Sequence, residues 1–204
     1  MSHSVGILGG AFNPPHVGHL VLAQEAVCTL GLDELIFVPT GQAPHKAIAP
    51  EPGARVRLEL AEAAVAGIEG ARVSDAEVAR EGPSYAFRTL ELLADELPGS
   101  QLTFVMGADV AAGLEGWHRP ERVLELARIA IARRPGVGRS EVDAALNRLG
   151  VAEGALEVPM PEIGISSTLI RDRVAAGLPV RWLVPDTVAA LIAERGLYRQ
   201  AVGV

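Results

Sequence analysis

The sequence predicts an α/β fold in which a mostly parallel β-sheet carries helices on both faces, followed by a small helical portion at the C-terminal end. Short apolar runs rich in β-branched residues alternate with longer segments of helical period along the chain, which is typical of repeated βαβ units. Hydrophobic residues make up 49% and charged residues 21%, ordinary values for a globular protein. With 204 residues, one domain spanning residues 1–204 is the default expectation.

The strands and helices are predicted from length and periodicity. Strands are expected at residues 5–8, 35–38, 71–74, 102–105 and 129–132. Helices are expected at residues 17–30, 55–66, 84–97, 120–127, 140–149, 167–176 and 185–195, the last two within a helical part at about 166–199. Leu90, Leu93, Ala94 and Leu97 share one face of the 84–97 helix, which Ser84 is expected to cap. Gly177 and Gly196 are expected to end the last two helices.

Charge and composition exclude several classes of protein. The formal net charge is -7 and the pI about 5.3, which argues against a binder of polymeric nucleic acid but not against a small anionic substrate. The one cysteine, Cys28, excludes an internal disulfide and is expected to be a buried structural thiol. Neither a signal peptide nor a membrane-spanning stretch is found, so we expect a cytoplasmic enzyme without membrane association.

The first predicted strand runs directly into the sequence GGAFNPPHVGH, residues 9–19. Gly9 and Gly10 allow a sharp turn and a close approach of the backbone to a ligand. Asn13 or the prolines after it are expected to begin a helix, whose free N–H groups would form a site for an anion. Ligands of parallel sheets bind beyond the carboxyl ends of the strands, which is where this motif lies.

His16 and His19 stand three residues apart, so both imidazoles are expected on one face of the first helical turn. Gly18 between them leaves space for a phosphate, and paired donors suit the charge that grows on phosphoryl oxygens during transfer. The motif is neither a Walker A loop nor a dinucleotide-binding GxGxxG. A zinc site would need more ligands than Glu25, the one candidate nearby; two unrelated surface histidines remain the other alternative.

A second candidate anion site begins the predicted helix at residues 167–176. Ser166 or Ser167 is suited to cap that helix, and its first N–H groups can bind an anion. Arg171 lies one turn further on the same face, and its planar guanidinium suits phosphate. An ordinary capped helix explains the serines but not an arginine at that offset.

Both motifs resemble those of the HxGH nucleotidyltransferases, and GGAFNPPHVGH resembles the nicotinate-nucleotide adenylyltransferase branch in particular. That branch more often has Thr or Ser at Ala11 and Asp at Asn13, so no metal ligand is assigned to Asn13. The resemblance, which extends over about residues 5–198, implies a Rossmann-like, doubly wound fold. It also implies transfer of the adenylyl group of ATP to nicotinate mononucleotide, giving deamido-NAD and pyrophosphate in NAD biosynthesis. Mg²⁺ would be bound mainly through ATP, with no protein metal site assigned.

The resemblance implies three catalytic side chains and a set of ATP contacts. His16 and His19 would bind the triphosphate and the α-phosphoryl oxygens, and Arg171, with the serines beside it, the leaving pyrophosphate. The ATP-binding residues implied are Gly9, Gly10, Ala11, Phe12, Gly18, Gly107, Asp109, Arg134, Ile165, Ser166 and Ser167. Asp109 would bind a ribose or substrate hydroxyl, and Arg134 lies in the edge near adenine.

For the acceptor, the resemblance implies contacts with His45, Lys46, Ser84, Tyr85, Ala86, Trp117 and His118. Trp117 would stack on the pyridinium ring, a favourable cation–π arrangement. Ala86 and Arg88 depart from the Thr and Asp of the family pattern, whereas Trp182 is expected to pack. Nicotinamide mononucleotide, phosphopantetheine or FMN as acceptor, and a nucleotide-binding module without turnover, remain alternatives; a homo-oligomer is left open.

Overall fold

A computed structural model describes residues 2–44, 48–133 and 139–199. One six-stranded sheet forms the centre, and all five strand pairings are parallel, in the order β3-β2-β1-β4-β5-β6. The strands are β1 (Ser4–Gly10), β2 (Glu34–Pro39), β3 (Ala71–Val73), β4 (Gln101–Gly107), β5 (Arg128–Arg133) and β6 (Leu156–Pro159). The five predicted strands are confirmed. The edge strand β6 was not predicted, because only Val158 in it is buried and its pattern is therefore weak.

The seven predicted helices are also confirmed, within one or two residues at their ends. They are α1 (Val17–Leu30), α2 (Ala54–Val65), α3 (Ala86–Glu96), α5 (Pro120–Leu126), α6 (Arg139–Arg148), α7 (Ser167–Ala175) and α8 (Asp186–Glu194). The short helix α4 (Ala108–Ala111) and the 3-10 turn η1 (Leu114–Gly116) were missed. Elements of three or four residues are too short to show a helical period.

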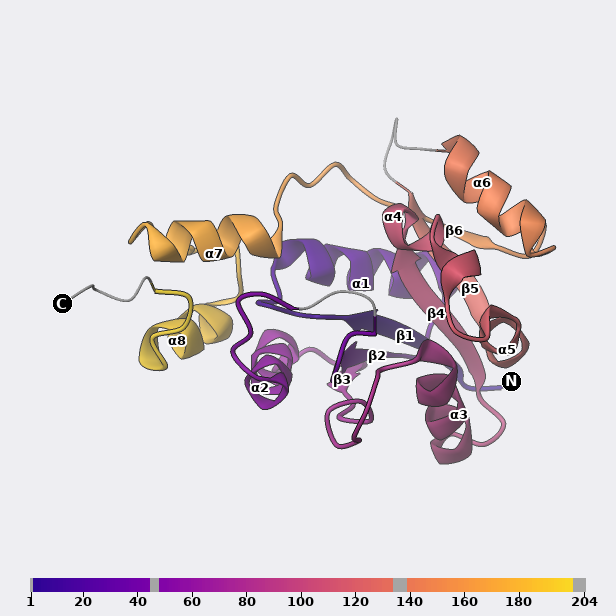
Figure 1. Cartoon of the computed structure of the whole chain (residues 1–204), viewed down its shortest axis with the longest axis horizontal. Helices are drawn as coiled ribbons and strands as arrows, with labels where there is room; N and C mark the ends of the chain where they lie inside the picture. The colour runs from indigo at the N-terminus through magenta and orange to yellow at the C-terminus, as the bar shows by residue number, and fades with distance from the viewer. Residues whose placement is uncertain (1, 45–47, 134–138, 200–204) are drawn as a thin grey trace.

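Two hydrophobic cores cover the two faces of the sheet. On one face, Leu8, Phe37 and Val105 pack against α1 and α2. On the other face, alternate strand residues such as Ile7 and Phe104 pack against α3 to α6. Figure 1 shows α1 and α3 on opposite sides of the strands. This arrangement confirms the Rossmann-like, doubly wound fold, with a sheet that is entirely rather than mostly parallel.

The C-terminal helices form a third apolar cluster with the outer side of α2. Leu60 and Ala64 of α2 contact Ile170 of α7 and Val188 and Ile192 of α8, all of them buried. Gly177 and Gly196 follow α7 and α8 in left-handed conformation, φ 69° and 61°, and therefore end these helices as predicted. The extent of the helical part, and the prediction that the chain is one domain, remain predictions.

Two predicted helix starts are wrong. Ser84 does not cap α3, which begins after Tyr85. Its hydroxyl instead accepts hydrogen bonds from the N–H groups of Gly41 and Gln42, at 3.0 and 3.2 Å. Neither Asn13 nor the prolines begin α1, because the N-cap residue of that helix is His16.

Two predicted buried side chains are exposed. Cys28 lies two residues after the buried Ala26 of α1, hence about 200° around the helix, and faces solvent. Trp182 is 81% exposed. It sits at φ 68° in the turn closed by a bridge between Arg181 and Val184, and this turn directs Trp182 outward while Val184 is buried.

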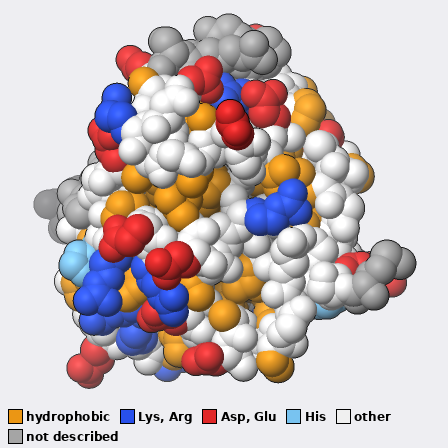
Figure 2. All heavy atoms as spheres, turned by 90° about the vertical axis from the view of Figure 1, so that its right-hand side faces the viewer, with side chains coloured by type: hydrophobic (Ala, Val, Ile, Leu, Met, Phe, Trp, Pro, Cys, Tyr) orange, Lys and Arg blue, Asp and Glu red, His pale blue; other side chains and the backbone are white. Residues whose placement is uncertain are grey.

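Surface charges are mixed in sign. Figure 2 shows a face on which acidic side chains lie beside basic ones. Ion pairs such as Arg122 with Glu91 and Arg148 with Glu115 join side chains of opposite charge from neighbouring elements. Within the described part of the chain, no helix has the length and apolar character needed to cross a bilayer.

Candidate active site

A cavity of about 740 Å³ opens at the carboxyl end of the sheet. Gly9 and Gly10 at the end of β1 and Gly107 at the end of β4 line it. Strand order reverses between β1 and β4, and this switch point is where open parallel sheets bind their ligands. The cavity lies within the volume range of small-molecule and cofactor sites.

His16 and His19 both line the cavity, with ring centroids 4.0 Å apart. The Nδ1 atom of His16 accepts from the Gly18 N–H, and the Nδ1 atom of His19 accepts from the His16 N–H, each at 3.2 Å. A neutral imidazole that accepts at Nδ1 carries its proton on Nε2. The capping contacts of α1 therefore fix both rings as Nε2–H donors, and the predicted pairing of the two histidines is confirmed.

Burial of the His19 ring, reinforced by the neighbouring His16 imidazole, lowers the pKa of His19 from 6.5 to about 3. In the absence of a bound anion, the His19 ring is consequently neutral at neutral pH. It can donate a hydrogen bond to a phosphate oxygen, but it offers no positive charge to attract one.

This lowered pKa predicts a pH-dependent stability. Between about pH 6.5 and pH 3 the unfolded chain binds a proton at His19 that the folded chain does not, so stability falls as the pH falls through this window. We expect the unfolding free energy of wild type relative to His19→Asn to fall by up to about 1.4 kcal/mol per pH unit. Urea denaturation of both proteins at several pH values measures this difference, and a pH-independent difference would contradict the lowered pKa.

A substitution at Gly18 is predicted to lower activity while leaving stability unchanged. A Cβ at this position would lie 3.0 Å from the Cε1 and Nδ1 atoms of His16. Alanine favours a helix by up to about 1 kcal/mol over glycine, so Gly18→Ala is expected to keep the melting temperature while displacing the His16 ring. We expect kcat to drop roughly tenfold, consistent with the cost of a misplaced catalytic group. Gly116→Ala, where a Cβ meets nothing within 4 Å, is the control; unchanged turnover in Gly18→Ala would exclude the steric argument.

Five of the seven residues predicted for the acceptor line the same cavity as the two histidines. Ser84, Tyr85, Ala86, Trp117 and His118 all line it. The Tyr85 and His118 rings are stacked, with their centroids 4.5 Å apart, and the Trp117 ring packs edge-on against the Phe104 ring, with a centroid distance of 5.8 Å. This wall is aromatic and able to hold a flat ring.

Arg88, which stands where the family pattern has Asp, does not line the cavity. Its guanidinium lies 5.9 and 5.8 Å from the ring centroids of Tyr85 and Phe87, and Arg119 lies 5.3 Å from the Phe87 ring. Both cations therefore lie in cation–π contact with Phe87, a ring that packs against the cavity-lining Tyr85 and His118.

The predicted ATP contacts divide into three groups. Gly9, Gly10, Gly18, Gly107, Asp109, Ile165 and Ser166 line the cavity. Ala11, Phe12, Ser167 and Arg171 do not: Phe12 is 1% exposed and packs edge-on against His19, and the Ser167 hydroxyl donates to the Pro14 carbonyl at 2.8 Å. Arg134 lies outside the described residues, as do His45 and Lys46, which were predicted to contact the acceptor rather than ATP.

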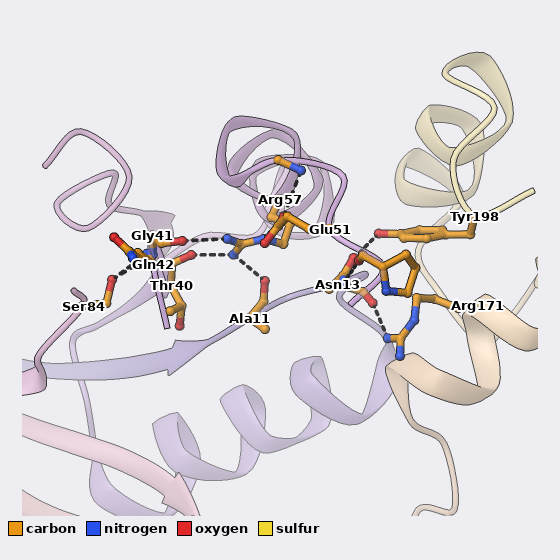
Figure 3. A network of polar contacts seen from close by, with 12 residues as sticks. Ala11, Asn13, Thr40, Gly41, Gln42, Glu51, Arg57, Ser84, Arg171 and Tyr198 are labelled. Carbon is orange, nitrogen blue, oxygen red and sulfur yellow. Dashed lines mark hydrogen bonds and ion pairs between the residues drawn. The ribbon is translucent and has the colours of Figure 1, made fainter. Parts of the chain in front are cut away.

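Arg57 is a functional candidate that the sequence reasoning missed. Its side chain is fully buried and donates to the carbonyls of Ala11, Thr40 and Gly41 and to the Glu51 carboxylate. Figure 3 shows the guanidinium between the turns that follow β1 and β2. The available signal was its position, since an arginine three residues before Leu60 stands on the apolar face of a predicted helix.

Glu77 was also missed. Its carboxylate lines the cavity, is 8% exposed and accepts a 2.6 Å hydrogen bond from Thr89. Gly41 packs against its main chain so closely that a Cβ at Gly41 would meet the Glu77 carbonyl oxygen at 2.2 Å. No motif marks Glu77, because only folding brings it against the end of β2.

No group of three or more His, Cys, Asp or Glu side chains capable of holding a metal occurs among the described residues. The cavity is lined by the exposed Asp109, by Glu77, whose carboxylate accepts from Thr89, and by three histidines. Two of these, His16 and His19, have their Nδ1 atoms engaged with backbone N–H groups. Such a donor set suits a cation that arrives with its own phosphate and water ligands.

An all-parallel sheet with a histidine pair at the first helix and a cavity at the switch point defines a nucleotide-binding enzyme of the phosphate-transferring class. The cytidylyltransferase-like family matches residues 7–173. The relatives include two bacterial proteins, each named "Probable nicotinate-nucleotide adenylyltransferase". That of Dehalococcoides mccartyi is 40% identical over 202 residues, covering 98% of this chain and 99% of the relative; that of Gloeobacter violaceus is 39% identical, covering 100% of both. The chain belongs to the cytidylyltransferase-like family and, within it, to the nicotinate-nucleotide adenylyltransferases.

Solved structures agree on the fold. Plasmodium falciparum nicotinic acid mononucleotide adenylyltransferase complexed with APC superposes with a TM-score of 0.76 at 15% identity, covering 96% of this chain and 97% of that chain. The same protein complexed with NaAD gives a TM-score of 0.73 at 16% identity, with the same coverage. At such identities the likeness establishes the architecture, and the roles of individual residues depend on the geometry described above.

Proposed function

We propose that the protein transfers the adenylyl group of ATP to nicotinate mononucleotide, producing deamido-NAD and pyrophosphate. The observation that carries the proposal is the pair of Nε2–H donors of His16 and His19 at the cavity wall. A nucleotide-binding module without turnover would not need two imidazoles held in one tautomer. The relatives of 39–40% identity carry the matching name.

The reaction is an in-line displacement at the α-phosphorus of ATP. A phosphate oxygen of the mononucleotide forms the new P–O bond, and the bond to the β-phosphate breaks, with pyrophosphate leaving. His16 and His19 would donate to the α-phosphoryl oxygens, where negative charge is redistributed in the transition state. No protein nucleophile is required, because positioning the two anions supplies most of the catalysis.

The leaving pyrophosphate would lie at the N-terminus of α7. Ser166 lines the cavity there, and the first N–H groups of a helix have no partner within the helix. The Ser167 hydroxyl is engaged with Pro14, so we propose that Ser167 contributes its main-chain N–H. Arg171, whose guanidinium is fixed by Asn13 and Thr168, would add positive charge behind this site.

Mg²⁺ would enter the site as a complex with the substrate ATP. When bound, it neutralises phosphate charge, and its ligands would be triphosphate oxygens and water. The protein residues bind and orient the complex, with the main-chain turn at Gly9 and Gly10 allowing close approach and Asp109 available to a ribose hydroxyl.

The acceptor would lie against Trp117, Tyr85 and His118. A pyridinium ring on an aromatic face is stabilised by about 0.5–2 kcal/mol. Helix α3 begins at Ala86, which lines this part of the cavity. The first N–H groups of the helix would favour the carboxylate of nicotinate over the carboxamide of nicotinamide. Lys46, outside the described residues, would screen the phosphate.

The proposal is tested by incubating the protein with Mg²⁺–ATP and one acceptor at a time: nicotinate mononucleotide, nicotinamide mononucleotide, phosphopantetheine or FMN. Chromatography of the products should show deamido-NAD formed with the first acceptor at the highest kcat/KM. Preference for another acceptor would correct the substrate. ATP binding without product from any acceptor would establish the module without turnover instead.

A further inference from the structure

We propose that Tyr198, near the C-terminal end, is a positioning residue for adenylyl transfer that acts through Asn13 on both substrate sites. The inference rests on the proposed function, since its readout is the transfer reaction. Neither residue lines the cavity. Figure 3 shows the two side chains facing each other, with Arg171 on the other side of Asn13.

Asn13 joins three separate parts of the chain. Its side-chain Oδ1 accepts a 2.7 Å hydrogen bond from the Tyr198 hydroxyl, and its Nδ2 donates to the Pro50 carbonyl at 2.8 Å. Its main-chain carbonyl accepts a 2.9 Å hydrogen bond from Nη1 of Arg171. Asn13 is 3% exposed, so water cannot readily replace these partners.

The chemistry of the amide fits this position. The Pro50 carbonyl can only accept, so Nδ2 must point toward it and Oδ1 toward Tyr198. A carboxylate could accept from Tyr198 but could not donate to Pro50. This chain therefore uses both the oxygen and the NH2 group of the Asn13 side chain, at a position where the nicotinate-nucleotide adenylyltransferase branch more often has aspartate.

Tyr198 is suited to donate over the whole physiological pH range. Burial raises the pKa of its phenol, and the nearby Arg171 and Arg57 guanidinium groups oppose this shift only in part. Its backbone is left-handed, φ 61°, a conformation that non-glycine residues adopt rarely and that the surroundings must hold in place. The hydrogen bond with Asn13 and the Leu197 N–H bonded to the Ile192 carbonyl hold this end of the chain.

Through these three contacts, Asn13 is connected both to the proposed pyrophosphate site and to the turn after β2. Arg171 belongs to α7, at whose N-terminus we place the pyrophosphate. Pro50 precedes Glu51, whose carboxylate binds the same Arg57 guanidinium that holds the carbonyls of Thr40 and Gly41. If the phenol hydroxyl is removed, the Asn13 amide loses one of two anchors. Both Arg171 and the Pro50 segment are then less precisely placed.

The test compares Tyr198→Phe with Thr187→Val. Thr187 donates its hydroxyl to the Ala63 carbonyl and ties α8 to α2 without contacting Asn13, so its variant reports the stability of the helical part alone. We expect Tyr198→Phe to lower kcat/KM for both substrates about five- to tenfold, the equivalent of one hydrogen bond, and Thr187→Val to leave kinetics within about twofold. Melting temperatures of both variants accompany the assay.

A double-mutant cycle with Asn13→Ala completes the test. If Tyr198 acts through Asn13, the double variant Asn13→Ala/Tyr198→Phe is expected to be no slower than Asn13→Ala alone. Multiplied effects in the double variant would overturn the proposal, as would kinetics of Tyr198→Phe that equal those of Thr187→Val. A wild type without transfer activity would instead refute the proposed function, so the two failures are distinguishable.

Discussion

His19→Ala is expected to lower kcat at least about a hundredfold while the fold is retained. The Nε2–H of this ring is fixed by the His16 N–H on the opposite nitrogen, and removal of one such preorganised donor typically costs 10²–10³ in rate. The ring packs against Phe12 and His16 and also lines the cavity, so the loss of its volume should be tolerated. A pyrophosphate-release assay measures the rate, and circular dichroism measures the fold.

His3→Ala is the matched control for this variant. His3 precedes β1 at the opposite end of the sheet, and its imidazole lies beside the carboxylates of Asp33 and Glu34, so we expect wild-type turnover. Near-wild-type rates in folded His19→Ala would exclude this histidine from the chemistry and with it the role of the paired donors.

Arg57→Met should have the largest effect on stability. It leaves the carbonyls of Ala11, Thr40 and Gly41 without their donor and removes a fully buried cation paired with Glu51. Loss of one member of such a network costs about 3 kcal/mol, which corresponds to roughly 6–12 °C in melting temperature at this chain length. We also expect turnover to fall strongly, because the turn after β1 leads to His16 and His19 and the turn after β2 carries Thr40, all of which line the cavity.

Arg55→Met, on the exposed side of the same helix, removes a cation of the same size and is expected to leave the free energy of unfolding within about 0.5 kcal/mol of wild type. Urea titration of both variants measures the difference. Equal stability of Arg55→Met and Arg57→Met would contradict the role assigned to the buried guanidinium.

Much of the fold could be predicted because local patterns and the final structure agree. The alternation of β-branched runs with helical segments predicted five of the six strands, and Leu90 and Leu93 marked the buried side of α3 correctly. Failures occurred where tertiary context decides. Ser84 has the chemistry of a helix cap, yet its hydroxyl is used by the backbone after β2, and Trp182 is turned outward by a left-handed backbone that no periodicity reveals.

The candidate site was predictable where a motif is contiguous. His16 and His19 are three residues apart, at the N-cap and N3 positions of α1, and the reciprocal contacts of this capping box hold the two rings together. Arg57, Glu77 and Tyr198 belong to no motif, because their partners are brought to them from distant parts of the chain: the contact of Tyr198 with Asn13 spans 185 residues. Such side chains become visible only when burial and hydrogen bonding are known.

The fate of the ATP phosphates tests the central claim most directly. ATP labelled at the α-phosphate or at the γ-phosphate is incubated with the protein, Mg²⁺ and nicotinate mononucleotide, and the products are separated. Attack at the α-phosphorus predicts that the α-label appears in deamido-NAD and the γ-label in pyrophosphate, in equal amounts and only when the mononucleotide is present. Release of the γ-label as orthophosphate, or release that does not depend on the acceptor, would contradict adenylyl transfer.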